Sequence, residues 1–193
     1  MKNLKTLVLS LIAAAMCSCG QQTAKATEPA PTDVQAQKTL VTYVSFSGTT
    51  KSVAEKLASL LNADLVRLEP EQAYTSADLD WNDSNSRCNK EHNDPSIRPA
   101  LKTTISNLAD YDVIYLGYPI WWNLAPQLIK TFLDNNDLSG KKVVPFATSG
   151  GSGIENSVSD LKKSYPNIQW QTGKRLRTST SNDEIQQWTS EIK

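Results

Sequence analysis

The stretch from Leu40 to Leu61 most constrains the fold, because an apolar run stops abruptly in small hydroxylated residues and a helical pattern begins at once. The first part, 40–46, is rich in β-branched, aliphatic and aromatic residues, as is typical of a buried parallel strand. Apolar residues then recur at helical spacing at Val53, Ala54, Leu57, Ala58, Leu60 and Leu61. The pattern predicts a strand that passes directly into a helix.

The loop between this strand and helix has the composition of an anion-binding turn. A helix start leaves its first N–H groups unpaired and carries roughly half a positive charge, so it suits a phosphate. Gly48 allows close approach of the backbone, and Ser45, Ser47, Thr49 and Thr50 offer hydroxyl donors. The segment has neither the GxxxxGK[ST] nor the GxGxxG pattern, which favours a monophosphate held without a metal. The alternative is that these residues only cap the helix.

Composition limits the domain count and the partners. The chain has 193 residues with 39% hydrophobic content, which is enough for one α/β domain. Its 20 basic and 20 acidic residues balance, so nothing points to nucleic acid. One histidine, together with Cys88 as the one thiol beyond the N-terminal region, argues against a structural zinc site. We expect no metal.

Residues 1–18 have the pattern of a lipoprotein signal peptide. Lys2 and Lys5 precede an apolar run, 7–15, that is too short to cross a bilayer as a permanent helix. Cys19 follows the small Ser18, which is the pattern of a lipidation site, and we expect a lipid there. The alternative is ordinary cleavage without a lipid.

The rest of the N-terminal region predicts where the protein is held. Residues 19–38 are rich in Ala, Thr, Gln and Pro, which predicts a flexible tether ahead of a domain over 39–193. Cys17 follows the bulky Met16 and is therefore the poorer lipidation site. We expect the protein at the cell envelope, outside the cytoplasm, with the lipid as its only contact with the membrane.

Strands and helices alternate along the rest of the chain. Further strands are predicted at 63–68, 111–117, 142–147 and 168–176, and a helix from Pro126 through Leu133. Two capping boxes, Ser152–Glu155 and Ser181–Glu184, predict two more helix starts. This alternation predicts an α/β fold with a doubly wound parallel sheet. Pro145 lacks a donor inside a predicted interior strand, so we expect a bulge or an early strand start there.

Two more loops should open on the same edge of such a sheet, where ligands bind. In the segment 117–123 we expect Gly117 to end the strand and Pro119 to stiffen a bend that presents large flat side chains, above all Trp121 or Trp122. The segment 148–153 combines glycines with hydroxyl donors. One loop suits a phosphate, one a flat apolar surface and one a polar rim, which together favour an aromatic heterocycle on a phosphorylated chain.

These three loops, taken in order, resemble the flavodoxin-like family over about residues 39–192. Residues 45–50 are similar to the family's phosphate loop, and 117–122 and 148–153 to its isoalloxazine loops. The resemblance implies a three-layer sandwich around a five-stranded parallel sheet of order 2-1-3-4-5, noncovalent FMN and electron transfer. The cofactor-binding residues it implies are Ser45, Ser47, Gly48, Thr49, Thr50, Pro119, Ile120, Trp121, Trp122, Thr148, Ser149, Gly150 and Gly151. No side chain need be catalytic, because the flavin ring supplies the chemistry.

The chain also departs from the electron-carrier flavodoxins, which are strongly acidic and have an acidic, aromatic third loop. Here the charge is balanced and the third loop is rich in Ser and Gly. Three functions stay open: electron transfer at the envelope, an NAD(P)H-dependent FMN reductase of quinones or similar small acceptors, and a non-redox binding module. The sequence does not identify the redox donor or acceptor.

The segment 70–98 is a long polar stretch without periodicity. Structureless loops beyond roughly 15 residues are uncommon unless they are functional or disordered. This one follows the second strand, so it should emerge on the ligand edge. The side chains that could cover a flavin or admit a substrate are Tyr74, Trp81, Arg87, His92 and Arg98. The alternative is a surface excursion that packs on itself.

Overall fold

A parallel sheet forms the centre of the fold in the computed structural model, which describes residues 37–192. Its strands are β1 (Thr39–Tyr43), β2 (Asp64–Arg67), β3 (Val113–Pro119), β4 (Lys142–Thr148), β5 (Gln169–Trp170) and β6 (Lys174–Arg175). The order is β2-β1-β3-β4-β5. Both β5 and β6 pair with β4, β5 with its first residues and β6 with residues near its end. The predicted order 2-1-3-4-5 is therefore confirmed, with two short segments sharing the fifth position.

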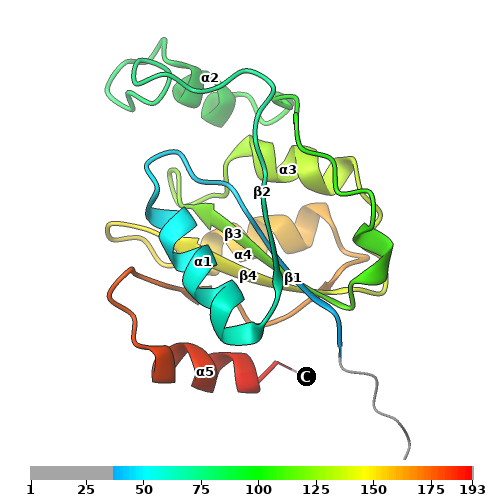
Figure 1. Cartoon of the computed structure of the whole chain (residues 1–193). Helices are drawn as coiled ribbons and strands as arrows, with labels where there is room; N and C mark the ends of the chain where they lie inside the picture. The colour runs from blue at the N-terminus through cyan, green and yellow to red at the C-terminus, as the bar shows by residue number, and fades with distance from the viewer. Residues whose placement is uncertain (1–36, 193) are drawn as a thin grey trace, which may run out of the picture. The chain divides into compact units, whose positions relative to one another are not determined.

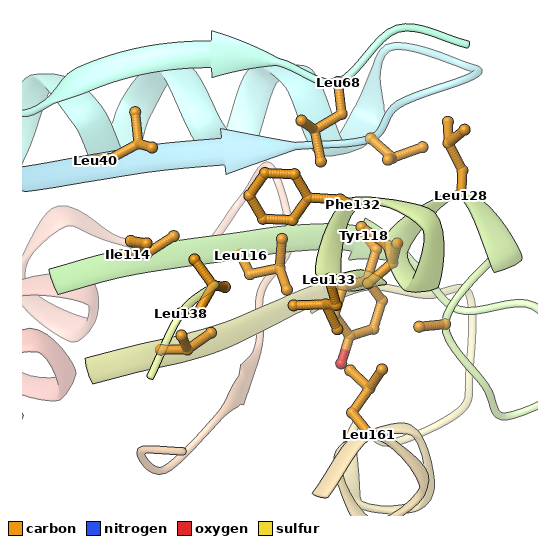
Figure 2. Packing of buried hydrophobic residues seen from close by; sticks show 14 of the residues in the cluster. Leu40, Leu68, Ile114, Leu116, Tyr118, Leu128, Phe132, Leu133, Leu138 and Leu161 are labelled. Atoms are coloured by element: carbon orange, nitrogen blue, oxygen red, sulfur yellow. The ribbon is translucent and has the colours of Figure 1, made fainter. Parts of the chain in front are cut away.

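Helices cover both faces of the sheet (Figure 1). They are α1 (Thr49–Leu61), α2 (Arg87–Asn93), α3 (Gln127–Asp134), α4 (Glu155–Ser164) and α5 (Asn182–Ser190), with a 3₁₀ turn at Leu108–Asp110. Alternate strand residues point to opposite faces. Val41 and Tyr43 pack with α1 and α5, whereas Leu40 joins the cluster that contains α3 and α4. Figure 2 shows the second cluster, in which Phe132 of α3 lies over the strands.

The two predicted capping boxes have different outcomes. Ser181 caps α5 as predicted, because its hydroxyl accepts a hydrogen bond from the Glu184 N–H at 3.1 Å. At the start of α4 the prediction is wrong: the helix begins at Glu155, its N-cap residue is Ile154, and no side chain caps it. The Glu155 carboxylate lies within 2.0 Å of where a Cβ on Gly153 would be, so it turns back toward the loop.

Pro145 lies inside β4 in regular pairing with Leu116 of β3, so the predicted bulge or early strand start is wrong. The carbonyls of Val143 and Ala147 accept hydrogen bonds from the N–H groups of Gln171 and Leu176, at 2.8 Å each. Pro145 has the same orientation because strand residues alternate. Its missing N–H therefore faces the break between β5 and β6, where no strand needs a donor.

The predicted N-terminal features fall mostly outside the described residues. The signal peptide over 1–18, Cys19 and most of the tether lie before residue 37. Lys38, the last residue of the predicted tether, already belongs to the fold, because its N–H donates to the Asp112 carboxylate at 2.9 Å and its carbonyl accepts from the Asp112 N–H at 2.9 Å. Within residues 37–192, every helix is too short or too polar to cross a membrane.

Candidate functional site

The first loop joins β1 to α1 through a left-handed glycine. Gly48 is the N-cap residue of α1, with φ +91°, a conformation that favours glycine. Within the described part of the chain no side chain caps this helix, so the N–H groups of its first turn keep their capacity to bind an anion. Ser47 and Thr49 are exposed at the turn, and their hydroxyl oxygens lie 3.2 Å apart.

The other two hydroxyls of this loop hold its shape. The buried Ser45 hydroxyl accepts a hydrogen bond from the Gly48 N–H at 3.2 Å. The buried Thr50 hydroxyl lies 2.8 Å from the Thr148 hydroxyl, which ties the first loop to the third. Arg67, at the end of β2, donates to the Ser45 carbonyl at 3.0 Å. These contacts fix the position of the donors at the start of α1.

The second loop begins later than the sequence predicted. Gly117 does not end the strand, because β3 continues to Pro119. A Cβ on Gly117 would lie 2.1 Å from the Phe146 ring, so this glycine is explained by packing between β3 and β4. The turn proper runs from Trp121 to Leu124, whose backbones exchange hydrogen bonds of 2.9 and 2.8 Å.

The centre of that turn is strained. Trp122 and Asn123 have φ of 45° and 65°, which asparagine tolerates and tryptophan rarely adopts. The two indoles point to different neighbours: Trp121 stacks on Phe46 with 4.7 Å between ring centroids, and Trp122 stacks on His92 at 4.6 Å. The turn thus holds two flat side chains in fixed and separate positions.

The third loop follows β4 and is held by its neighbours. The Arg175 guanidinium donates to the Gly151 carbonyl at 2.8 Å, and the Ser149 hydroxyl accepts from the Gly151 N–H at 3.1 Å. A Cβ on Gly150 or Gly151 would meet no atom within 4 Å. The loop therefore borders open space.

One open groove of about 470 Å³ gathers these loops at the carboxyl ends of β1, β3, β4 and β6. This volume is within the range of roughly 300–1,000 Å³ that is typical of small-molecule sites. In Figure 1 the connections into α1, α4 and α5 lie on the same side of the sheet. The predicted residues that line the groove are Ser47, Thr49, Pro119, Ile120, Trp121, Thr148, Ser149 and Gly150.

The remaining predicted residues do not line this groove: Ser45, Gly48, Thr50, Trp122 and Gly151. Sequence reasoning missed a fourth contributor, Leu176–Ser179, which follows β6. The signal was present, because a loop after the last parallel strand must open on the same edge as the others. Among residues 37–192, Arg177 is the one charged residue that lines the groove, and its cation suits an anionic ligand.

The segment 70–98 meets the second loop, as expected from its place after β2. The Tyr74 ring packs edge-on against Phe46 and Trp121, at centroid distances of 4.6 and 6.0 Å. The segment contains the helix α2, which the sequence did not predict; its Ser86 cap accepts from the Asn89 N–H at 3.4 Å. Arg98 is directed elsewhere, to Asp134 of α3.

A buried ion pair fixes Tyr74. Arg87 donates to the Glu91 carboxylate at 2.7 Å, and the Tyr74 hydroxyl, 2.8 and 2.7 Å from the two Glu91 oxygens, donates its one proton to the same carboxylate. Burial raises the pKa of Glu91, outweighing the opposite effects of Tyr74 and Arg87. Burial and the Glu91 carboxylate raise the pKa of Tyr74 well above its usual range. Tyr74 is therefore a neutral donor, held against the aromatic pair of Phe46 and Trp121.

The fold and the groove together define a class: doubly wound α/β proteins that bind a ligand at the carboxyl edge of the sheet, where the strand order reverses. Within that class the chain belongs to the flavodoxin family, whose model matches residues 38–192. A comparison with curated proteins found no match.

Solved structures from two Bacteroides species are similar to this chain. The B. eggerthii protein is 50% identical, with a TM-score of 0.79 over 81% of this chain and 98% of its own. The B. uniformis protein is 44% identical, with a TM-score of 0.77 over 81% and 100%. A Lactobacillus acidophilus flavoprotein, solved in complex with FMN, is 25% identical, with a TM-score of 0.64 over 80% and 99%.

Proposed function

We propose that this protein binds FMN in the groove and transfers electrons at the cell envelope. The observation that carries the proposal is the groove itself, which joins the uncapped start of α1, an indole and a hydroxyl-rich rim, with Arg177 as its charged residue. The FMN complex of the Lactobacillus acidophilus flavoprotein, which shares the fold, supports the choice of ligand.

The residues of the groove fit the two ends of FMN. The first-turn N–H groups of α1, with Ser47, Thr49 and Arg177, suit a phosphomonoester dianion. Trp121 offers a flat apolar surface for the ring system, backed by its stack on Phe46. Thr148, Ser149 and Gly150 supply polar groups and open space at the rim.

When bound, FMN supplies reversible transfer of one or two electrons, and the protein supplies position and field. The Thr50–Thr148 contact fixes the position of the first loop relative to the third. Tyr74 and Phe46 pack against Trp121 and hold it in place. Arg177 places a positive charge on the groove, which stabilises an anionic ligand.

A direct test is the absorption spectrum of the protein as isolated, followed by chromatography of what heat releases. The proposal predicts a flavin spectrum and free FMN. A colourless protein that shows neither flavin fluorescence quenching nor a thermal shift on addition of FMN would contradict it.

A reductase is the second candidate, favoured by the aromatic and titratable groups that the segment 70–98 places beside Trp121. Steady-state oxidation of NAD(P)H by the FMN-loaded protein, with a quinone as acceptor, separates the two functions. Turnover indicates a reductase, and reduction only by a partner protein or by dithionite indicates a carrier.

Attachment to the envelope by a lipid on Cys19 is also a proposal, supported by Ser18 before it and by the apolar run 7–15. Labelling with a radioactive fatty acid in a bacterial host tests it. We expect label on the wild type and on Cys17→Ala and none on Cys19→Ala. Equal labelling of the two variants, or no labelling of the wild type, would contradict a lipid on Cys19.

A further inference from the structure

A second hollow lies beside the groove and shares a wall with it. It has a volume of about 360 Å³ and is lined by Leu79, Trp81, Cys88, Ile120, Trp121 and Trp122. Ile120 and Trp121 line both spaces, whereas the other four residues line only the hollow. The segment 70–98 and the second loop thus form a space that is separate from the groove.

The exposed hydrophobic surface of the described residues is concentrated at this hollow. Within residues 37–192, three large hydrophobic side chains are exposed: Leu65, Trp81 and Trp122. Two of them line the hollow, and the Trp81 side chain is the most exposed, at 69%. Indoles left in water beside a concave apolar surface are typical of a binding site.

The protein holds the backbone that presents Trp81 and the indole of Trp122. The Asn89 side-chain amide donates to the Trp81 carbonyl at 3.0 Å and to the Asp83 carbonyl at 2.9 Å, which clamps the turn that presents Trp81. Trp122 is fixed by its closed turn and by its stack on His92. A surface that is ordered before binding loses less entropy when a ligand arrives.

We propose that this hollow is a second binding site, for a small, flat, uncharged aromatic molecule. The volume suits a small molecule, the exposed indoles of Trp81 and Trp122 suit a flat ring, and none of the six lining side chains carries a charge. This site is additional to the FMN groove, and the binding does not depend on the proposed function.

The test uses 2-naphthol as the probe, titrated into FMN-saturated full-length protein and followed by ligand-detected NMR. The wild type should show saturable binding, and Trp81→Ala should weaken it about tenfold, the effect of losing one aromatic contact. Trp81→Phe keeps a flat ring and should retain most of the affinity. Leu65→Ala is the matched control, since it removes an exposed hydrophobic side chain outside the hollow and should leave binding unchanged.

A charged probe and competition with FMN provide two further tests. Naphthalene-2-sulfonate should bind more weakly than 2-naphthol, because none of the described residues that line the hollow has a cation to pair with a sulfonate. Absence of saturable binding, equal binding by wild type and Trp81→Ala, or displacement of the probe by FMN would overturn the proposal. If the protein takes up no FMN, the proposed function fails, and the dependence on Trp81 is then measured without FMN.

Discussion

At the residue scale, Gly117 shows how a packing requirement can imitate a functional signal. Its place in a loop-like sequence beside Pro119 suggested a strand end, yet it lies within β3 and opposite Phe146 of β4. The Phe146 ring is fully buried and lies where a side chain on residue 117 would be. The glycine therefore belongs to the core.

Gly117→Ala should destabilise the protein by about 1–3 kcal/mol, because the added methyl group would overlap the buried Phe146 ring. Urea denaturation followed by circular dichroism measures the free energy of unfolding. Gly150→Ala is the control, since its Cβ would meet no atom within 4 Å, and it should change stability far less. Equal losses in the two variants would show that the Phe146 contact is unimportant.

Arg177 allows a second test at this scale, because its charge concerns only one end of FMN. Arg177→Ala should weaken FMN binding roughly three- to tenfold, the effect of losing a charged interaction at an exposed site. Binding of riboflavin, which lacks the phosphate, should not change. Fluorescence titration measures both, with Lys163→Ala on α4 as the control for loss of an exposed cation. A similar loss for riboflavin would place Arg177 at the ring end or outside the site.

At the scale of elements, the segment 70–98 depends on a buried carboxylate. Glu91 lies in α2 between Arg87 and Tyr74, and burial raises its pKa. An acid whose pKa is raised on folding contributes stability at low pH, and this contribution is lost as the pH rises through the folded pKa. The stability that Glu91 contributes should therefore depend on pH.

Glu91→Gln removes this titration and can keep the hydrogen bond from Tyr74. The free energy of unfolding of the wild type, relative to that of Glu91→Gln, should fall as the pH rises from about 4 to about 7. Chemical denaturation at several pH values measures the difference. A difference that stays constant or grows with pH would mean that the Arg87 ion pair outweighs burial.

The helices and strands differ in how well the sequence predicted them. The hydrophobic pattern located α1 and α5, which each bury one face, and β3, which is a continuous buried run. It missed α2, a short helix defined by one ion pair and a serine cap. It misjudged Pro145 because the direction of a missing N–H depends on which neighbours pair with the strand.

At the scale of the whole molecule, the fold and most of the groove could be predicted, because parallel strands bring all their following loops to one edge. The first and third loops were found from composition, and the structure joins them through Thr50 and Thr148. The split of roles between Trp121 and Trp122 could not be predicted, since it depends on an unusual turn and on two partners, Phe46 and His92.

The central claim is that one groove, built from four loops, holds FMN. The most direct measurement is a ¹H–¹⁵N NMR titration of the protein with FMN, with backbone assignments. The account predicts 1:1 binding, with the largest shifts at the amides of 47–50, 120–121, 148–150 and 176–179. Shifts confined to residues outside these loops, or no shifts at saturating FMN, would contradict it.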